Sequence, residues 1–349
     1  MTVPFAINGL GRIGRALLRI AAARDDVEVV AVNELVPGEA VARLLARDTL
    51  RGPFPDPSPG PGGPSRPGAS AVRAEDGALV IGSRRIPLSA ASDPAACRWA
   101  GTGARVVVEA TGAFLGREAA DHLRGEVERV VLTANSEAAD VTLCLGVNDG
   151  DYDPARHRLI SNASCTTNCL APLALVLDRA FGLEHALMTT VHGYTGNQRL
   201  LDAYHPEPRR ARAAAANVVP VETTAPRALG RILPALAGRV EGLAVRVPTP
   251  VVAMLHLDAA LAAEPAAGAV RDAFRAAAAG GFGARLAAVL AVTDEELVGS
   301  DFVGSPWSAV VDLPLVQATG NLVRVAAWYD NEWGYATRLA DLVARLGAP

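Results

Sequence analysis

The sequence predicts an α/β protein of two domains, with a doubly wound parallel sheet first and a largely antiparallel sheet second. Residues 3–35 have the pattern of a strand, a glycine-rich turn, a helix and a second strand. Near-continuous apolar runs at 105–112 and 129–135 are typical of parallel strands buried on both faces. After residue 165 apolar and polar residues alternate, as in HALMTTVHGY at 185–194, which is typical of a sheet with one covered face.

Each element of the first half follows from its local pattern. VPFAI at 3–7 predicts a buried strand, ALLRIAAAR at 16–24 a helix, and VEVVAVNEL at 27–35 the next strand. This order is that of a Rossmann-type mononucleotide-binding half. In the second half, CLAPLALVLDRAF at 169–181 predicts a helix. The tail WGYATRLADLVARLG predicts an amphipathic helix whose apolar face carries Leu339, Leu342, Val343 and Leu346.

Length and charge narrow the function classes. The chain has 349 residues, for which two domains is the natural expectation. Its net charge of −4 does not favour a nucleic-acid or membrane-surface binder. All 33 basic residues are arginine, which excludes a lysine Schiff base and a P-loop lysine. RGPFPDPSPGPGGPSRPGAS at 51–70 predicts a surface loop without regular structure.

The expected location is the cytoplasm. The first residues lack a charged segment followed by an apolar one, so we expect no signal peptide. No apolar run reaches about 18 residues, so we expect no transmembrane helix. Four cysteines are too few for a disulfide scaffold, and a reducing compartment fits them best.

The glycine-rich turn predicts a dinucleotide site. Gly9, Gly11 and Gly14 form G-x-G-x-x-G between a predicted strand and helix, which lets a pyrophosphate approach the helix N-terminus. Glu34 stands 20 residues after Gly14, at the end of the second strand. Its carboxylate can accept hydrogen bonds from ribose hydroxyls and would repel a 2′-phosphate. The pattern therefore predicts NAD as cofactor rather than NADP.

The cysteine pair in SNASCTTNCLAP, at 161–172, predicts one reactive thiol. Ser161, Asn162 and Ser164 are N-cap residue types, so Cys165 is expected at a helix N-terminus, where a thiolate is stabilised. Cys169 lies one turn further along and is expected to be buried. A zinc site is not expected, because no second pair of ligands has the right spacing, and a disulfide within one helix has poor geometry.

A base is expected near this thiol. His192 ends the predicted strand ALMTTVH and precedes the polar loop GYTGNQR. A strand end beside a loop is where a base can meet a helix N-terminus, although position alone equally permits a structural histidine.

Several strings together resemble the phosphorylating glyceraldehyde-3-phosphate dehydrogenase family. They run in family order along nearly the whole chain, leaving out mainly 51–70. They are NGLGRIGR (8–15), EATGAF (109–114), SNASCTTNCLAP (161–172), TTVHGYTGNQRLLD (189–202), RRARAAAANVVP (209–220), VRVPTP (245–250) and WYDNEWGY (328–335).

The resemblance implies a role for each matching residue. Cys165 matches the nucleophile and His192 the base. The positions that match NAD contacts are Gly9, Gly11, Arg12, Ile13, Gly14, Glu34, Thr111, Thr133, Asn331 and Tyr335. The positions that match the sites of the substrate phosphate and of inorganic phosphate are Thr195, Asn197 and Arg246, and Ser164, Thr166 and Thr223. No metal is implied.

The resemblance also implies a reaction and an assembly. The thiolate would attack the aldehyde, hydride would pass to NAD, and phosphate would release the acyl group from a thioester. We expect a NAD-binding domain over 1–164, regaining the C-terminal helix 331–349, and a catalytic domain over 165–330. The family's homotetramer would place the 193–217 loop against a neighbouring subunit's cofactor.

Three departures from the family pattern leave alternatives open. Asn197 replaces an aspartate, Thr224 replaces a glycine in the inorganic-phosphate loop, and Glu34 replaces an aspartate. The strings NEL, DAYHPEPRR and PVET resemble erythrose-4-phosphate dehydrogenases, whose acyl-enzyme is released by water. A third hypothesis is a diverged NAD-binding regulator without turnover.

Overall fold

The computed structural model describes residues 2–54 and 72–347, which form two compact units. Unit 1 comprises residues 1–141, 152–162 and 336–349, and unit 2 comprises 142–151 and 163–335. Most of the predicted loop at 51–70 lies outside the described residues. Within the described ranges, no helix is long and apolar enough to cross a membrane.

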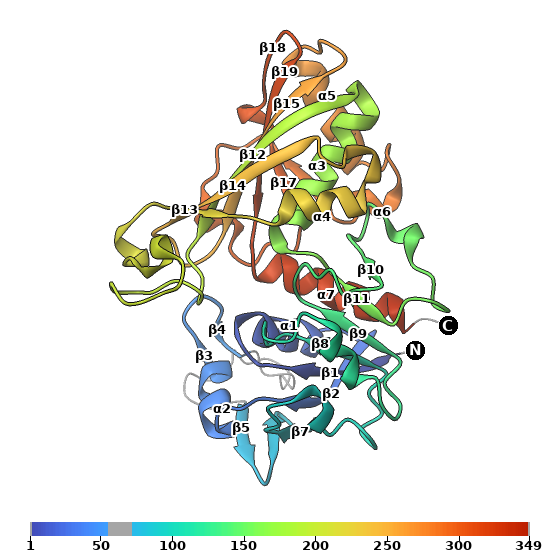
Figure 1. Ribbon diagram of the computed structural model, residues 1–349, viewed down its shortest axis with the longest axis vertical. Helices are drawn as coiled ribbons and strands as arrows, with labels where there is room; N and C mark the ends of the chain where they lie inside the picture. The colour runs from blue at the N-terminus through green and yellow to red at the C-terminus, as the bar shows by residue number, and fades with distance from the viewer. Residues whose placement is uncertain (1, 55–71, 348–349) are drawn as a thin grey trace, which may run out of the picture. The chain divides into compact units, whose positions relative to one another are not determined.

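Unit 1 is built on a nine-stranded sheet of order β10-β11-β9-β8-β1-β2-β7-β6-β5 (Figure 1). Adjacent strands from β11 to β7 are parallel, and β5 and β6 add an antiparallel edge. The strands are β1 Val3–Asn8, β2 Val27–Asn33, β5 Val72–Glu75, β6 Ala78–Ile81, β7 Arg84–Ser89, β8 Val106–Glu109, β9 Arg129–Leu132, β10 Val141–Thr142 and β11 Leu159–Ser161. β1, β8 and β9 are almost wholly buried, as their continuous apolar sequences predict.

Helices and a short ribbon accompany this sheet. They are α1 Arg12–Ala22, α2 Gly38–Ala46, the 3-10 helices Pro94–Ala96 and Arg117–His122, and the ribbon of β3 Arg47–Asp48 and β4 Gly52–Pro53. The predicted helix at 16–24 thus begins four residues earlier, at Arg12. Gly11 supplies its extended N-cap, so the glycine turn runs straight into the helix.

Unit 2 contains an eight-stranded mixed sheet of order β13-β14-β12-β15-β19-β17-β16, with β18 paired to β19. The β12–β14 and β16–β17 pairs are parallel, and the other pairs are antiparallel. The strands are β12 Leu183–Gly193, β13 Val219–Glu222, β14 Val240–Val247, β15 Ala253–Leu261, β16 Leu290–Thr293, β17 Ala309–Asp312, β18 Gln317–Thr319 and β19 Leu322–Tyr329.

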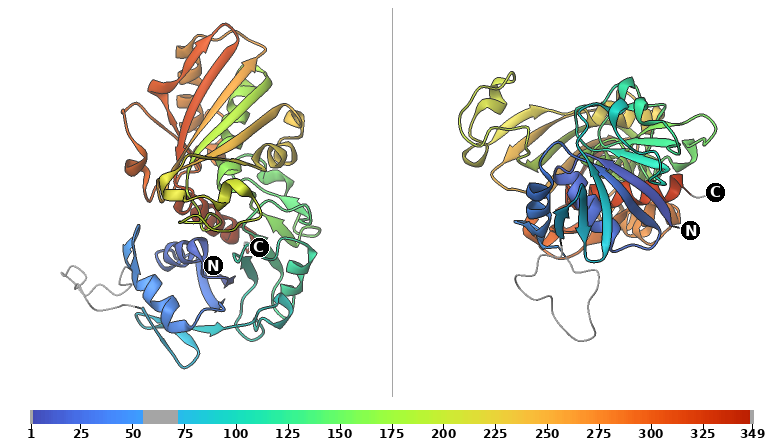
Figure 2. Two further views of the ribbon diagram at one scale, coloured as in Figure 1. Left: turned by 60° about the vertical axis from the view of Figure 1, so that its left-hand side comes forward. Right: turned by 90° about the horizontal axis from the view of Figure 1, so that it is seen from below.

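One face of this sheet is covered by helices (Figures 1 and 2). α3 Cys165–Phe181 packs on β12, β15 and β19, beside α4 Ala225–Ile232 and α5 Ala267–Ala278. The remaining α-helices are α6 Ala284–Ala287 and α7 Trp333–Leu346, which enters unit 1 at Ala336. Short 3-10 helices are Asp149–Asp151, Pro208–Ala211, Ala214–Ala216, Pro234–Leu236, Gly299–Phe302 and Leu313–Leu315. Burial alternates strictly along β15, which confirms the predicted one-sided burial of this strand.

Candidate active site

Cys165 is the first residue of α3. Ser164 is the N-cap, with extended backbone, and its Oγ accepts a hydrogen bond from the Thr167 N–H at 3.1 Å. Ala163 precedes it with a φ of 54°, a region that favours glycine, and the Tyr335 hydroxyl donates to the Ala163 carbonyl at 3.1 Å. The chain is therefore turned sharply so that the thiol lies at the N-terminal end of the helix, where the dipole favours an anion.

His192 lies beside this thiol. The Cys165 Sγ is 3.7 Å from the His192 Nε2, within the range of a sulfur hydrogen bond. His192 occupies a position on β12 that faces α3, and it is only 2% exposed, whereas Cys165 is half-buried. The pair predicted from the sequence is thus brought together, with the thiol as its accessible member.

Arg246 approaches the other side of the imidazole. β14 runs parallel to β12, and Arg246 is in register with His192. Its Nη1 donates to the Gly193 carbonyl at 3.3 Å and contacts the His192 Nδ1, while its buried Nε has no hydrogen-bond partner among the described residues. Arg210, which the sequence analysis did not assign, has its Nε paired with the Glu207 carboxylate at 2.6 Å. The Nε of Arg246, which has no such partner in the described part of the chain, can bind an anion.

Two contacts at Nδ1 correspond to two different tautomers of the imidazole. Nδ1 lies 2.7 Å from the Gly193 carbonyl oxygen, which can only accept, so that bond requires a proton on Nδ1. In this tautomer the Nε2 lone pair faces the Cys165 thiol, as a base requires. The Arg246 contact with Nδ1 belongs to the alternative tautomer, since an arginine only donates.

The Cys165 thiol titrates under opposing influences. Burial raises its pKa above that of an ordinary cysteine, while the positive charge of Arg246 and a hydrogen bond with Thr166 lower it. Burial has the larger effect, so the free thiol is mostly protonated at neutral pH and needs a base to ionise. Cys169, one turn further along α3, is fully buried, and burial raises the pKa of its thiol well above the usual range.

A buried tyrosine links the elements around the thiol. The Tyr329 hydroxyl, at the end of β19, lies 3.0 Å from the Thr166 Oγ1 and 2.7 Å from the Thr190 Oγ1. Its ring meets the His192 ring edge-on, with centroids 6.0 Å apart. Sequence reasoning assigned no role to Tyr329 or Thr190, although Tyr329 lies in the string WYDNEWGY.

The other predicted phosphate residues lie in the loops after β12 and β13. Thr195 is half-buried, and Asn197 is exposed with its Oδ1 3.3 Å from the His205 Nε2. Thr223 accepts from the Ala225 N–H at 3.3 Å, at the start of α4. Thr224 has a φ of −92°, an ordinary value, so the residue replacing glycine sits there without backbone strain.

The predicted cofactor residues of unit 1 form a close-packed turn. Gly9 has a φ of +93°, and a Cβ there would lie 2.8 Å from the Thr111 nitrogen. A Cβ on Gly14 would lie 2.1 Å from the Gly9 carbonyl oxygen, so only glycine fits. Arg12 and Ile13 begin α1, and the Glu34 carboxylate accepts from the Leu10 N–H at 2.7 Å and the Val36 N–H at 3.2 Å. These contacts hold Glu34 against the glycine loop.

The predicted cofactor residues of unit 2 differ in what they can offer a ligand. Asn331 is 6% exposed, and its Oδ1 has no hydrogen-bond partner among the described residues. A buried amide oxygen without a hydrogen-bond partner can accept from an N–H group of a ligand, such as that of a carboxamide. The Tyr335 hydroxyl is instead committed to the Ala163 carbonyl. Within the described ranges, no cluster of His, Cys, Asp and Glu could hold a metal ion.

Comparison with known proteins gives matches along the whole chain. The family profile described as glyceraldehyde 3-phosphate dehydrogenase, NAD binding domain, matches residues 3–117, and the profile of the C-terminal domain matches residues 164–331. A glyceraldehyde-3-phosphate dehydrogenase 2 of Streptomyces arenae is 45% identical over 100% of this chain and 99% of its own. Glyceraldehyde-3-phosphate dehydrogenases of Kitasatospora aureofaciens and Geobacillus stearothermophilus are 46% and 42% identical, over 98% and 100% of this chain and 98% and 99% of their own.

The fold and these matches define an NAD-dependent oxidoreductase with a Rossmann-type domain and an α+β domain. The chain belongs to the glyceraldehyde-3-phosphate dehydrogenase family. The predicted family, fold class, enzyme class and cofactor are confirmed. The named relatives do not favour the erythrose-4-phosphate alternative.

Proposed function

We propose that this chain oxidises glyceraldehyde 3-phosphate with NAD and inorganic phosphate to 1,3-bisphosphoglycerate, through a thioester on Cys165. The observation that carries the proposal is the 3.7 Å approach of the Cys165 Sγ to the His192 Nε2, with Arg246 in register behind the imidazole. A thiol, a base and a cation for the substrate's phosphate are the groups that such a reaction requires.

The proposed reaction divides the work among these residues. His192 Nε2 takes the thiol proton, and the Cys165 thiolate adds to the aldehyde carbon, giving an oxyanion that would face the N-terminus of α3. The imidazolium returns this proton to the oxyanion, which completes the thiohemiacetal. His192 Nε2 then removes the hydroxyl proton of the thiohemiacetal. NAD, when bound, supplies the hydride acceptor for this oxidation. Inorganic phosphate attacks the resulting thioester, and the Cys165 thiolate leaves as the acyl phosphate forms.

Two groups of residues are proposed to hold the two phosphates. Arg246, with Thr195 and Asn197, would bind the phosphate of the aldehyde, since a half-buried guanidinium whose Nε has no hydrogen-bond partner within the described ranges suits an oxyanion. Ser164, Thr166 and Thr223 would bind inorganic phosphate through hydroxyls at the starts of α3 and α4.

The proposed NAD contacts are assigned within each unit separately. Gly9, Gly11, Arg12, Ile13 and Gly14 would hold the pyrophosphate, and Glu34 a ribose. Thr111, Thr133 and Asn331 would line the nicotinamide side, and Tyr335 would support the backbone next to Cys165. The tight turn at Gly9 and the orphan Asn331 Oδ1 support this assignment. The corresponding domains are 1–164 with 331–349, and 165–330.

An assay of NADH formation tests the proposed function. Purified protein is given glyceraldehyde 3-phosphate or erythrose 4-phosphate, each with and without inorganic phosphate. We expect fast turnover with the three-carbon aldehyde that depends on phosphate, because the hydroxyls and helix starts offer a second anion site. Phosphate-independent turnover of the four-carbon aldehyde would contradict the proposal and make Asn197 and Thr224 determinants of specificity. No turnover with either aldehyde would indicate a regulator.

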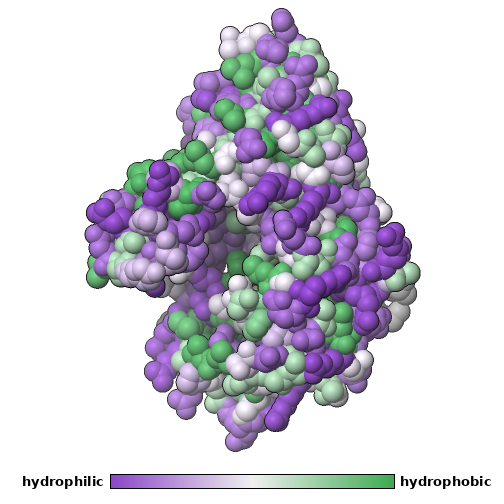
Figure 3. All heavy atoms as spheres, in the orientation of Figure 1, coloured by the Kyte–Doolittle hydropathy of each residue, from purple (hydrophilic) through white to green (hydrophobic). Residues whose placement is uncertain are grey.

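A homotetramer in the cytoplasm is proposed as the working form. Large apolar side chains are exposed on the open face of the unit 2 sheet and in the loop between β12 and β13, and green atoms are visible on this loop in Figure 3. They are Leu187, Leu243, Leu200, Leu201 and Val218. A second copy of the chain would cover them. Sedimentation equilibrium at micromolar protein should give four chains per particle, and a monomer would contradict this.

A further inference from the structure

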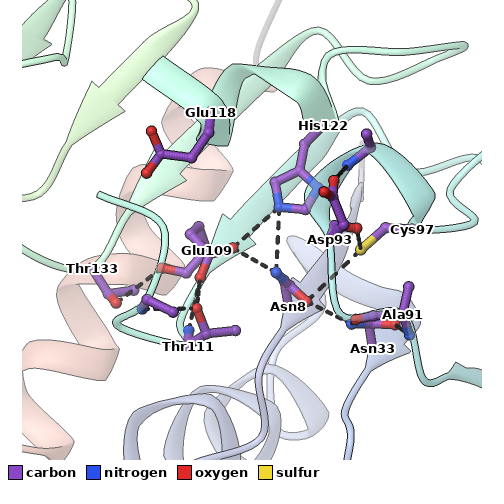
Figure 4. Close-up of polar contacts among 12 residues, drawn as sticks. Asn8, Asn33, Ala91, Asp93, Cys97, Glu109, Thr111, Glu118, His122 and Thr133 are labelled. Atoms are coloured by element: carbon purple, nitrogen blue, oxygen red, sulfur yellow. Dashed lines mark hydrogen bonds and ion pairs between the residues drawn. The ribbon is translucent and has the colours of Figure 1, made fainter. Parts of the chain in front are cut away.

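Unit 1 contains a buried carboxylate that the proposed mechanism does not use. Glu109 is the last residue of β8 and is 0% exposed. Its Oε2 accepts from the Asn8 Nδ2 at 2.5 Å and lies 3.1 Å from the His122 Nε2. Its Oε1 accepts from the Thr111 N–H at 2.9 Å and from the Thr111 hydroxyl. Figure 4 shows these groups converging on the carboxylate from separate elements.

A tryptophan fixes the tautomer of the histidine in this cluster. The Trp99 indole N–H, which can only donate, lies 3.0 Å from the His122 Nδ1. His122 Nδ1 is therefore the acceptor, and the ring proton is on Nε2, pointing at Glu109. Both oxygens of Glu109 thus receive two donors each. Four donors on two oxygens suit a carboxylate, which only accepts hydrogen bonds. A neutral side chain of the same shape would place a donor of its own against one of them.

Glu109, at the end of β8, ties the ends of β1, β2 and β9 to its own strand. Through its side chain it holds Asn8, the last residue of β1, whose Oδ1 in turn accepts from Asn33, the last residue of β2, at 2.8 Å. Through its backbone carbonyl it accepts from the Thr133 N–H at 3.2 Å and the Thr133 hydroxyl at 3.0 Å, just after β9. Ligands of open α/β sheets bind at the carboxyl ends of the strands, so Glu109 anchors the floor of that crevice.

The anchored residues touch the glycine loop directly. Gly9 follows Asn8, and its N–H donates to the Asn33 carbonyl at 2.8 Å. The missing Cβ of Gly9 leaves room for Thr111, which would otherwise lie under 3.0 Å from it. The Gly9 carbonyl in turn lies where a Cβ of Gly14 would be. A shift of Asn8 or Thr111 is therefore passed to the loop and to the start of α1.

We propose that Glu109 is a positioning residue that sets the geometry of the NAD site. His122 donates a hydrogen bond to it, and Trp99 fixes the tautomer of His122. The inference rests on the proposed assignment of the Gly9–Gly14 loop and Thr111 to that site. Glu109 acts through Asn8 and Thr111 and touches neither substrate nor the thiol of unit 2. Replacing Glu109 should therefore weaken the binding of NAD and leave the reactivity of Cys165 unchanged.

The test variant is Glu109→Gln in the full chain. Glutamine has nearly the same volume as glutamate. Its amide –NH₂ group, however, would face hydrogen-bond donors at whichever of the two oxygen positions it occupied. We expect the Kd and KM for NAD to rise about tenfold to a hundredfold. The kcat at saturating NAD and the rate of alkylation of Cys165 by iodoacetamide without NAD should stay within about threefold of wild type. Glu118→Gln, an exposed glutamate in the same region (Figure 4), is the matched control and should change none of them.

A second variant covers the case in which Glu109→Gln does not fold. Trp99→Phe leaves every contact of Glu109 in place but frees the His122 tautomer, and it should raise the Kd for NAD several-fold. A wild-type Kd in the folded variants would overturn the inference, as would equal losses of kcat and NAD affinity.

Gly14→Ala separates the two proposals. If this variant binds NAD as tightly as wild type, the assignment of the glycine loop is wrong. If it is the one variant with a weaker affinity for NAD, only the role of Glu109 fails.

Discussion

Cys165→Ala is expected to abolish NADH formation from glyceraldehyde 3-phosphate and to leave NAD binding intact. Alanine keeps the backbone at the start of α3 and removes only the sulfur, so neither thiohemiacetal nor thioester can form. The remaining groups cannot substitute, because His192 has no nucleophile to activate. The measurement is a steady-state assay with NAD binding followed in parallel by calorimetry.

Cys169→Ala is the matched control for this variant. Cys169 lies on the same helix one turn later and is fully buried, with a strongly raised thiol pKa. We expect its replacement to cost about 1 kcal/mol of stability and to leave turnover within about twofold of wild type. Turnover by Cys165→Ala, or its loss only in Cys169→Ala, would show that the nucleophile has been misassigned.

The position of this thiol was predictable because its signals are local. Ser164 is an N-cap residue type, and small polar residues precede an apolar helix, so Cys165 was expected at a helix N-terminus, although the apolar run itself begins only at Cys169. The buried strands of unit 1 were equally visible as continuous apolar runs. The break between β14 and β15 has a local cause as well, since Pro248 and Pro250 lack backbone donors there and Val252 adopts a φ of 72°.

The groups that sequence reasoning missed depend on contacts between distant positions. Tyr329 meets Thr190 and Thr166 across 139 and 163 residues, and no local pattern marks that meeting. Glu109 resembles any acid at the end of an apolar strand. Its role arises only because the sheet order places β1 between β8 and β2, which brings Asn8 and Asn33 to the same edge. A buried polar cluster of this kind depends on which strands are neighbours in the sheet, and the sequence alone does not give that order.

His192→Asn is expected to slow the first turnover by roughly 10²–10⁴, the usual contribution of a general base. Asparagine can keep a hydrogen bond to the Gly193 carbonyl, 2.7 Å from the native Nδ1, but it cannot accept a proton. The measurement is the pre-steady-state burst of NADH at saturating aldehyde and NAD. His185→Asn, an exposed histidine on the same strand, is the matched control and should show a wild-type burst.

The pH dependence of the variant separates a base from a structural histidine. Burial raises the pKa of the Cys165 thiol, so below that pKa the thiolate fraction grows about tenfold for each unit of rising pH. Without His192 nothing else takes the proton, and the burst rate should climb with pH along that line. The wild-type profile should be flatter, because the imidazole removes the proton at neutral pH. A variant that is slow at every pH by the same factor would instead mean that His192 only holds the site in shape, and the proton would have to leave by another route.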